Sequence, residues 1–121
     1  MTQGDVYWYD FGDPTGAEPG YRRPVVVVQN DALNRSGIGT TVVCGVTTNL
    51  ALGGLSSNVM LEAGEAGLPQ PSVVNVTQIA TVDKGRLRRR CGGLSRERLV
   101  EVLDGIRLVI EPESSPLVGP A

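Results

Sequence analysis

The chain has 121 residues, of which 40% are hydrophobic, and a formal net charge of −2. This length suits one compact domain, and the acidic balance argues against a protein that coats nucleic acid nonspecifically. No apolar run approaches the roughly 20 residues of a membrane span, and residues 1–10 lack the features of a signal peptide, so we expect a cytoplasmic protein without membrane contact. The chain has no histidine, which excludes the side chain best suited to acid–base catalysis at neutral pH.

The first third of the sequence predicts two strands separated by a long loop. Residues 4–11 alternate well enough for a strand that ends at Gly12. Residues 12–21 contain three glycines and two prolines, which predicts a loop projecting from the sheet. Pro24 can begin the next strand, and the four consecutive valines after it are typical of a strand buried on both faces. A polar stretch follows, with one helical turn capped by Asn30 or Asp31.

The remaining sequence predicts three further strands and a helix. The strands are expected at residues 40–49, 58–62 and 72–82, the last with a bend. Ser95 is a plausible N-cap, and apolar residues then recur at helical spacing: Leu99, Val100, Leu103, Ile106 and Ile110. We therefore expect one mainly β domain over residues 1–110, a small curved sheet or partly open barrel with a C-terminal helix lying across it, and a tail over residues 111–121.

Positive charge is concentrated near the end of the chain. Residues 84–98 hold seven basic side chains and one acidic one, and ten of the eleven cations in the chain are arginine. Arginine binds phosphate and carboxylate with two parallel hydrogen bonds, so this distribution indicates an anion-binding face. A solvated surface is the alternative for the run at Arg88–Arg90. Cys44 and Cys91 are too few and too far apart for a metal cluster and are expected to be small buried hydrophobes.

Four segments in a fixed order carry a resemblance to a known family. They are "GDVYWYDF", "DPTGAEPGYRRPVVVVQND", "TTVVCGVTTN" and "NVMLEAGEAGLPQPSVVNVTQIATVDKGRL". From Gly4 to about Ile110 the chain resembles the MazF/PemK family of toxin endoribonucleases. The resemblance implies an SH3-like barrel of the CcdB/PemK type that forms a homodimer and cleaves single-stranded RNA at short sequences, with neither metal nor other cofactor. It also implies inhibition by a cognate MazE-like antitoxin whose acidic tail lies over the RNA groove.

The same resemblance implies a reaction and three catalytic residues. The substrate's 2′-hydroxyl would attack the adjacent phosphate, leaving a 2′,3′-cyclic phosphate and a 5′-hydroxyl. Arg23 occupies the position of the family's catalytic arginine, and Thr47 that of its catalytic threonine. Glu18 matches a family glutamate that would either accept a proton or orient Arg23. Ala17 and Pro19 replace the Ser and Gln that usually flank this glutamate, which removes two hydrogen-bonding side chains and stiffens the loop.

A second group of residues is expected to contact RNA. Gln78 matches a position near the groove, where its amide would read a base edge or form a hydrogen bond within the sheet. Strand alternation points Arg22 to the face opposite Arg23, where a solvated role is the alternative. The predicted RNA-binding residues are Gln78, Arg22, Thr48, Tyr21, Arg88 and Arg89.

Two other functions fit the expected fold. A non-enzymatic CcdB-like toxin would bind DNA gyrase rather than cut RNA, but Arg23 and Thr47 in the ribonuclease pattern argue against it. A barrel without catalytic activity would serve only to bind its antitoxin, or to bind DNA together with the antitoxin and regulate its own expression. Activity of the isolated protein would exclude this last possibility.

Overall fold

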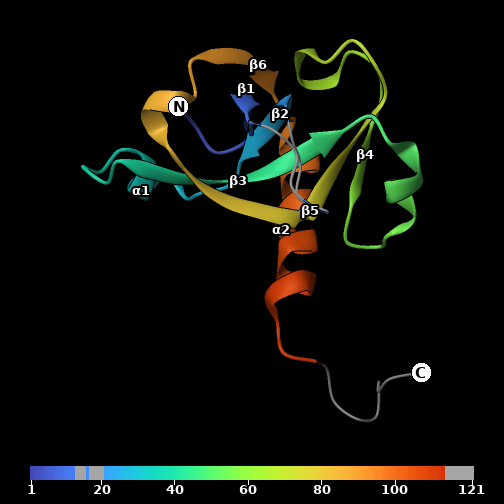
Figure 1. Ribbon diagram of the computed structural model, residues 1–121. Helices are drawn as coiled ribbons and strands as arrows, with labels where there is room; N and C mark the ends of the chain where they lie inside the picture. Colours follow the sequence, from blue (N-terminus) through green and yellow to red (C-terminus); the bar gives the residue numbers. More distant parts are fainter. Residues whose placement is uncertain (13–15, 17–20, 114–121) are drawn as a thin grey trace.

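The protein is described by a computed structural model, in which residues 1–12, 16 and 21–113 are placed (Figure 1). Six antiparallel strands form one sheet in the order β4-β5-β3-β2-β1-β6. The strands are β1 (Asp5–Asp10), β2 (Arg22–Val27), β3 (Thr40–Thr47), β4 (Val59–Leu61), β5 (Ser72–Asp83) and β6 (Arg89–Gly93). The helices are α1 (Asp31–Asn34), α2 (Arg96–Ile110) and the short 3-10 helices η1 (Leu50–Gly54), η2 (Glu65–Gly67) and η3 (Lys84–Arg86).

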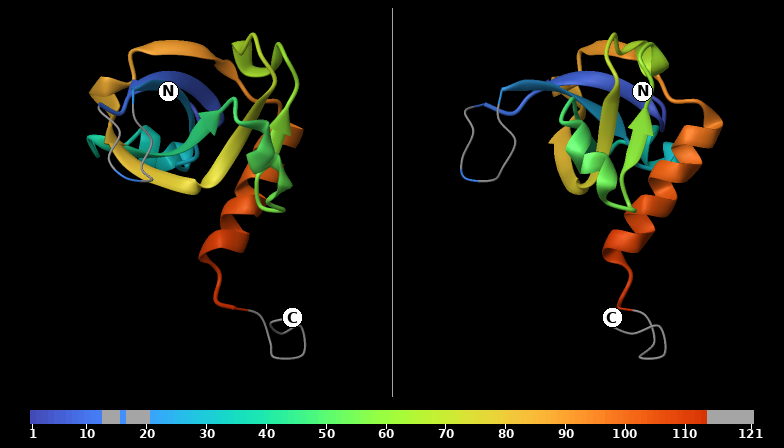
Figure 2. Two further views of the ribbon diagram at one scale, coloured as in Figure 1. Left: turned by 45° about the vertical axis from the view of Figure 1, so that its right-hand side comes forward. Right: turned by 90° about the vertical axis from the view of Figure 1, so that its right-hand side faces the viewer.

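The sheet curls strongly on itself, so that both of its faces are covered (Figure 2). Alternate valines of the second strand enter two different core clusters: Val25 and Val27 lie in one, and Val26 and Val28 in the other. Val25, Val26 and Val27 have no solvent exposure. This confirms the expectation of a strand buried on both faces, and with it the expectation of a mainly β curved barrel with a C-terminal helix.

Strand β6 was not expected from the sequence. It pairs with β1, with Arg89 opposite Trp8, and the register shifts between Val6 and Tyr7. The segment contains two arginines and two glycines, and glycine is depleted in strands. Pairing with β1 therefore determines its conformation, and the arginine run lies partly on a strand at the sheet edge.

The turn between β4 and β5 closes one side of the barrel by touching β6. A Cβ atom built on Gly67 would lie 2.0 Å from the carbonyl oxygen of Cys91, and one built on Gly92 would lie 2.5 Å from the carbonyl oxygen of Ala66. Gly67 also has a φ of +73°, which side chains rarely adopt. Two glycines thus allow η2 and β6 to meet backbone against backbone.

Helix α2 begins as expected and buries a different set of side chains. The hydroxyl of Ser95 accepts a hydrogen bond from the Arg98 amide at 3.2 Å, which confirms the N-cap. The buried residues of the helix are Val102 and Gly105, whereas Ile110 is 67% exposed. Leu103 and Ile106 of the expected stripe pack against the core, whereas Val100 and Ile110 are exposed. Ile110 is exposed because the helix packs on β4 and β5 and then extends beyond the barrel (Figures 1 and 2). Within the described residues, no helix is long and apolar enough to cross a membrane.

An ion pair fastens α2 to the η2 turn. Arg98 donates from Nε to one oxygen of Glu65 at 2.9 Å and from Nη2 to the other at 3.2 Å. The hydrogen bond from Arg98 is the main reason that the pKa of Glu65 lies below its usual value, and a bond from the Glu62 amide adds to the effect. A carboxyl group with a lowered folded pKa stabilises the fold above its unfolded pKa and loses that contribution as the pH falls.

We therefore expect Glu65→Gln to destabilise the protein at pH 7 by about 0.5–1 kcal/mol, because the pair is partly exposed to solvent. The difference between wild type and variant should shrink as the pH falls below the unfolded pKa of about 4.5. Urea unfolding of both proteins at pH 7 and pH 3 measures this difference in the free energy of unfolding. Glu113→Gln, at an exposed glutamate beyond the helix, is the control. A constant difference at both pH values would contradict the assignment.

Candidate active site

A hollow of about 300 Å³ lies where β2 begins and β3 ends, next to the segment before β5. This volume is at the small end of ligand pockets and suits a nucleotide-sized group. Its walls combine apolar, cationic and hydroxyl-bearing side chains from β1, β2, β3 and the η2–β5 segment. The lining residues are Trp8, Tyr21, Arg22, Arg23, Pro24, Val46, Thr47, Thr48, Leu68, Pro69, Gln70 and Ser72.

Strand register brings Arg23 and Thr47 together in this pocket. Val25 of β2 lies opposite Gly45 of β3. Extending this register by two residues places Arg23 opposite Thr47, and residues opposite each other on paired strands present their side chains to the same face. Both residues are half-buried. The two residues matched to the catalytic positions therefore come from segments 24 residues apart in sequence and share one face at the pocket.

The hydroxyl of Thr47 is oriented by the turn that follows β3. Its oxygen accepts a hydrogen bond from the Asn49 amide at 3.1 Å. The Asn49 side chain in turn accepts from the Ala51 amide at 3.3 Å, which caps η1. Because the Thr47 oxygen serves here as an acceptor, its own hydrogen remains for donation to a ligand oxygen.

Arg22 lies on the opposite face of β2 from Arg23, and Thr48 directly follows the last residue of β3. The guanidinium carbon of Arg22 lies 5.3 Å from the centroid of the Trp8 ring, within the range of a cation–π contact. Thr48 is exposed at the pocket rim. Arg22 thus has an aromatic partner in addition to solvent contact, and the alternation expected from the sequence accounts for the different surroundings of the two neighbouring arginines.

Tyr21 enters the pocket wall from a strained backbone position. Its φ is 60° and its side chain is 63% exposed. The Tyr21 carbonyl accepts from the Phe11 amide at 2.9 Å, and its amide donates to the Gly12 carbonyl. These two bonds hold the residue in a region that non-glycine residues seldom adopt, and strain of this kind often occurs at functional sites.

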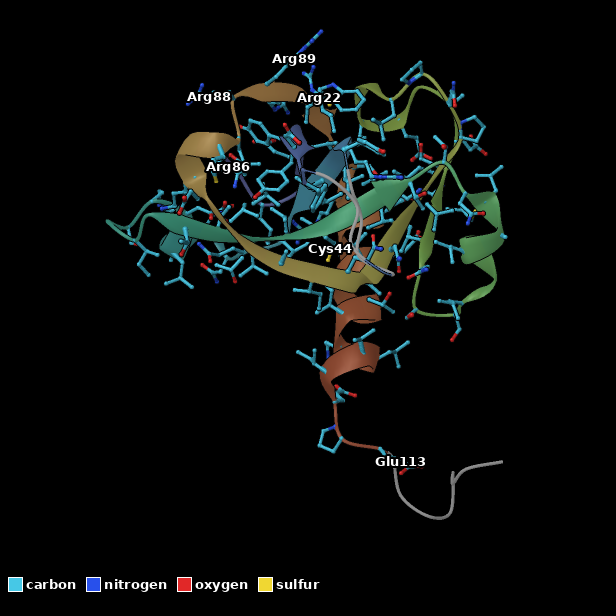
Figure 3. The ribbon with its side chains drawn as sticks, viewed as in Figure 1. Arg22, Cys44, Arg86, Arg88, Arg89 and Glu113 are labelled. Atoms are coloured by element: carbon cyan, nitrogen blue, oxygen red, sulfur yellow. The ribbon has the colours of Figure 1, made fainter. Side chains whose placement is uncertain are left out.

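Three predicted RNA-binding residues lie outside the pocket lining. Gln78 lies at the irregularity in the β3–β5 pairing. Its side chain lies over Gly45, because a Cβ atom built on that glycine would be 2.7 Å from the Gln78 side-chain oxygen. Gly45 is two residues before Thr47 on β3, so Gln78 is near the Arg23–Thr47 pair. Arg88 is exposed and donates to the Gly85 carbonyl at 3.1 Å. Arg89 is exposed opposite Trp8, and Figure 3 shows Arg22, Arg88 and Arg89 at one edge of the barrel. Glu18, Ala17 and Pro19 lie outside the described residues.

Other pocket residues were missed by sequence reasoning. Trp8 was expected on a strand, within the aromatic N-terminal region that any base stacking would have to use, and Leu68, Pro69 and Gln70 fall between two expected strands. The two prolines on either side of Gln70 are the one local signal that this turn is rigid. It lines the same pocket as residues of β1 and β2 because the sheet curls, which no local pattern predicts.

Neither cysteine is set up as a nucleophile. Burial raises the pKa of Cys44 to about 12. Burial also raises the pKa of the half-buried Cys91, although the charges of Arg89 and Arg22 act in the opposite direction. Both thiols are therefore protonated at neutral pH, which fits the expectation of small core residues for Cys44 and leaves Cys91 at the core margin. In the part of the chain that the structure describes, no three acidic or cysteine side chains gather as a metal site would require.

Comparisons with known proteins agree with this architecture. Endoribonuclease MazF6 of Mycobacterium tuberculosis is 40% identical over 111 residues, which cover 92% of this chain and 97% of that protein. The crystal structure of MazF from Deinococcus radiodurans superposes with a TM-score of 0.75 at 25% identity and covers 93% of this chain and 97% of its own. A mycobacterial endoribonuclease in complex with its cognate antitoxin superposes with a TM-score of 0.70 at 20% identity, with coverage of 95% and 97%, and shows the same fold.

Residues 2–110 match the family described as PemK-like, MazF-like toxins of type II toxin-antitoxin systems. This match spans both pocket-forming strands, the turn before β5 and helix α2. The six-stranded curled sheet, the Arg23–Thr47 pair and the sequence matches lead to one conclusion: the chain belongs to the PemK/MazF toxin family.

Proposed function

We propose that this protein is the toxin of a type II toxin-antitoxin system and a sequence-specific endoribonuclease that cleaves single-stranded RNA without metal or other cofactor. The observation that supports this most directly is the convergence of Arg23 and Thr47 on one nucleotide-sized pocket, in a chain of this family. The pocket holds a fixed cation and a hydroxyl donor, and these are groups that stabilise a phosphate on which negative charge increases.

In the proposed reaction the nucleophile comes from the RNA. The 2′-oxygen attacks the adjacent phosphorus as its proton is removed, and the bond from phosphorus to the 5′-oxygen breaks. The leaving 5′-oxygen takes a proton, which gives a 5′-hydroxyl and a 2′,3′-cyclic phosphate. The pentavalent phosphorane between these states carries more negative charge than the substrate, so the guanidinium of Arg23 stabilises it more than the ground state.

The other residues have supporting roles in this proposal. Thr47 donates its hydroxyl hydrogen to a phosphate oxygen or orients the 2′-hydroxyl, since its own pKa is too high for a general base. Glu18 holds Arg23 in place, and proton acceptance is its alternative role. Gln78, Thr48 and the arginines at the barrel edge bind the RNA on either side of the cleaved bond.

The proposal includes a homodimer in the cytoplasm and an antitoxin with an acidic tail. Helix α2 supports the dimer, because its projecting end carries the exposed apolar side chains of Leu108, Val109 and Ile110, which a partner chain would cover. The exposed arginines at Arg88 and Arg89 support an acidic partner. A mycobacterial protein of the same fold was solved with its cognate antitoxin.

We expect the purified protein to cleave a long single-stranded RNA in excess EDTA, because no step of the proposed reaction uses a metal ion. Mapping of the ends should show 5′-hydroxyl and 2′,3′-cyclic phosphate groups at short repeated sequences. A substrate with 2′-deoxyribose at the cleaved nucleotide is the control and should stay intact, because it lacks the nucleophile. Loss of cleavage in EDTA would refute the mechanism, and gyrase-dependent DNA breaks with intact RNA would favour a CcdB-like toxin.

A further inference from the structure

We propose that Trp8 and Arg22 form a stacking platform for one unpaired nucleobase beside the cleaved phosphate, and that Gln70 reads the edge of this base. This inference rests on the proposed function and extends it to a specificity-determining subsite. It assigns a role to Trp8, Arg22 and Gln70, which line the same pocket as the Arg23–Thr47 pair.

The platform is aromatic and surrounded by positive charge. Trp8 is half-buried, so part of the indole is accessible in the pocket. Arg22 lies over the ring at 5.3 Å, and Arg89 lies opposite Trp8 across the β1–β6 pair. Unpaired bases stack both on aromatic rings and on guanidinium planes, and nearby cations attract the phosphates that flank them.

Arg22 of the platform and the proposed catalytic residue Arg23 are neighbours in sequence at the start of β2. Arg22, Pro24 and Trp8 face one side of the sheet, and Arg23 faces the other, since side chains alternate along a strand. Both sets line the same pocket. Pro24 fixes one backbone dihedral at the point where the segment enters the core, which restricts the backbone next to Arg22 and Arg23.

Gln70 lies across the pocket on a rigid wall. Pro69 and Pro71 flank it, and the Ser72 hydroxyl donates to the Gln70 carbonyl at 3.0 Å. The backbone is thus fixed, while the exposed side-chain amide offers one acceptor and two donors to the pocket. Stacking tolerates any base, so an amide that pairs with a base edge is the element that discriminates between bases.

Trp8 is the only tryptophan in the chain, so its fluorescence reports on the platform directly. The full-length protein would be titrated with an RNA oligomer that spans a mapped cleavage site and carries 2′-deoxyribose at the cleaved nucleotide. We expect a saturable change in fluorescence. An oligomer that is abasic at the flanking position should bind about tenfold more weakly and leave the fluorescence unchanged.

Two results of this titration would overturn the proposal. Equal fluorescence changes with the intact and the abasic oligomer would show that no base stacks on Trp8. A change produced by an acidic peptide such as oligoglutamate, and not by RNA, would assign the pocket to a protein partner. Binding is read without cleavage, so a homopolymeric RNA with and without abasic positions can replace the mapped oligomer. The titration therefore tests the platform even if the proposed ribonuclease activity is absent.

Variants separate the two roles. We expect Trp8→Leu to lower kcat/KM about tenfold or more, mainly through KM, and Trp8→Phe to restore most of the loss, because phenylalanine keeps a stacking face. Gln70→Ala should relax the base preference at one position of the mapped site about tenfold. Arg35→Gln, at an exposed arginine outside the pocket, should match wild type. Circular dichroism checks that each variant is folded.

One result with these variants would contradict the proposal. If Trp8→Leu and Gln70→Ala are folded and cut the same sites at wild-type rates, the platform has no role in recognition. If the wild-type protein leaves RNA intact, the proposed function fails, and the fluorescence titration alone decides on the platform.

Discussion

Arg23→Ala is expected to reduce kcat for RNA cleavage by about 10²–10³-fold, with little change in KM, because the guanidinium stabilises charge that develops only in the transition state. Arg23 lies at the start of a strand whose valines are fully buried, and its half-buried side chain is not part of either core cluster. Circular dichroism checks that the variant is folded. Single-turnover cleavage of a short RNA with one mapped site measures the effect on the chemical step.

The neighbouring arginine provides a matched comparison. Arg22→Ala removes the same charge from the adjacent position, but Arg22 faces Trp8 rather than Thr47. We expect its effect to fall on KM and to be about tenfold. Equal losses of kcat in the two variants would show that only general positive charge matters, and would contradict the role assigned to Arg23.

Thr47→Val should also reduce kcat by about 10²-fold, because valine keeps the branched shape that suits β3 and removes the hydroxyl that faces the pocket. The hydrogen bond from the Asn49 amide is lost as well, so the Thr47–Asn49 turn should become less ordered. Thr81→Val, at an exposed threonine of β5 outside the pocket, is the control and should keep wild-type activity.

A second comparison separates the hydroxyl from the turn. Asn49→Ala removes the cap of η1 while it keeps the Thr47 hydroxyl. If Thr47→Val retains wild-type kcat, the hydroxyl takes no part in the reaction. If Asn49→Ala is as inactive as Thr47→Val, the loss comes from the turn and not from the hydroxyl.

The core could be predicted because its signals are local. Four consecutive valines predict a strand covered on both faces, and the structure places alternate members in two clusters. Ser95 marks the first turn of α2 through its own hydrogen bond, which depends on neighbouring residues alone. The end of the helix could not be predicted in the same way. Apolar spacing shows which residues share a face, whereas the reach of the barrel decides how many of them are covered, and Ile110 lies beyond it.

The site depended on contacts that are distant in sequence. Strand register places Arg23 beside Thr47, and only the resemblance to a family indicated this pair beforehand. Strand β6 was missed because its residues are weak strand formers that need β1 as a partner. Trp8 lies on β1, next to one edge of the sheet, and Gln70 precedes β5, next to the other edge, so their meeting at one pocket depends on the curvature of the sheet.

The backbone contact between η2 and β6 lies outside the pocket lining, but it holds two segments that lead into the pocket walls. Gly67 directly precedes the Leu68–Gln70 wall, and Gly92 lies on the strand that carries Arg89 beside Trp8. Any side chain at either glycine would collide with the opposing backbone and move the two walls apart. If the pocket recognises RNA as proposed, substitutions at these two glycines would change the cleaved sequence without touching the substrate.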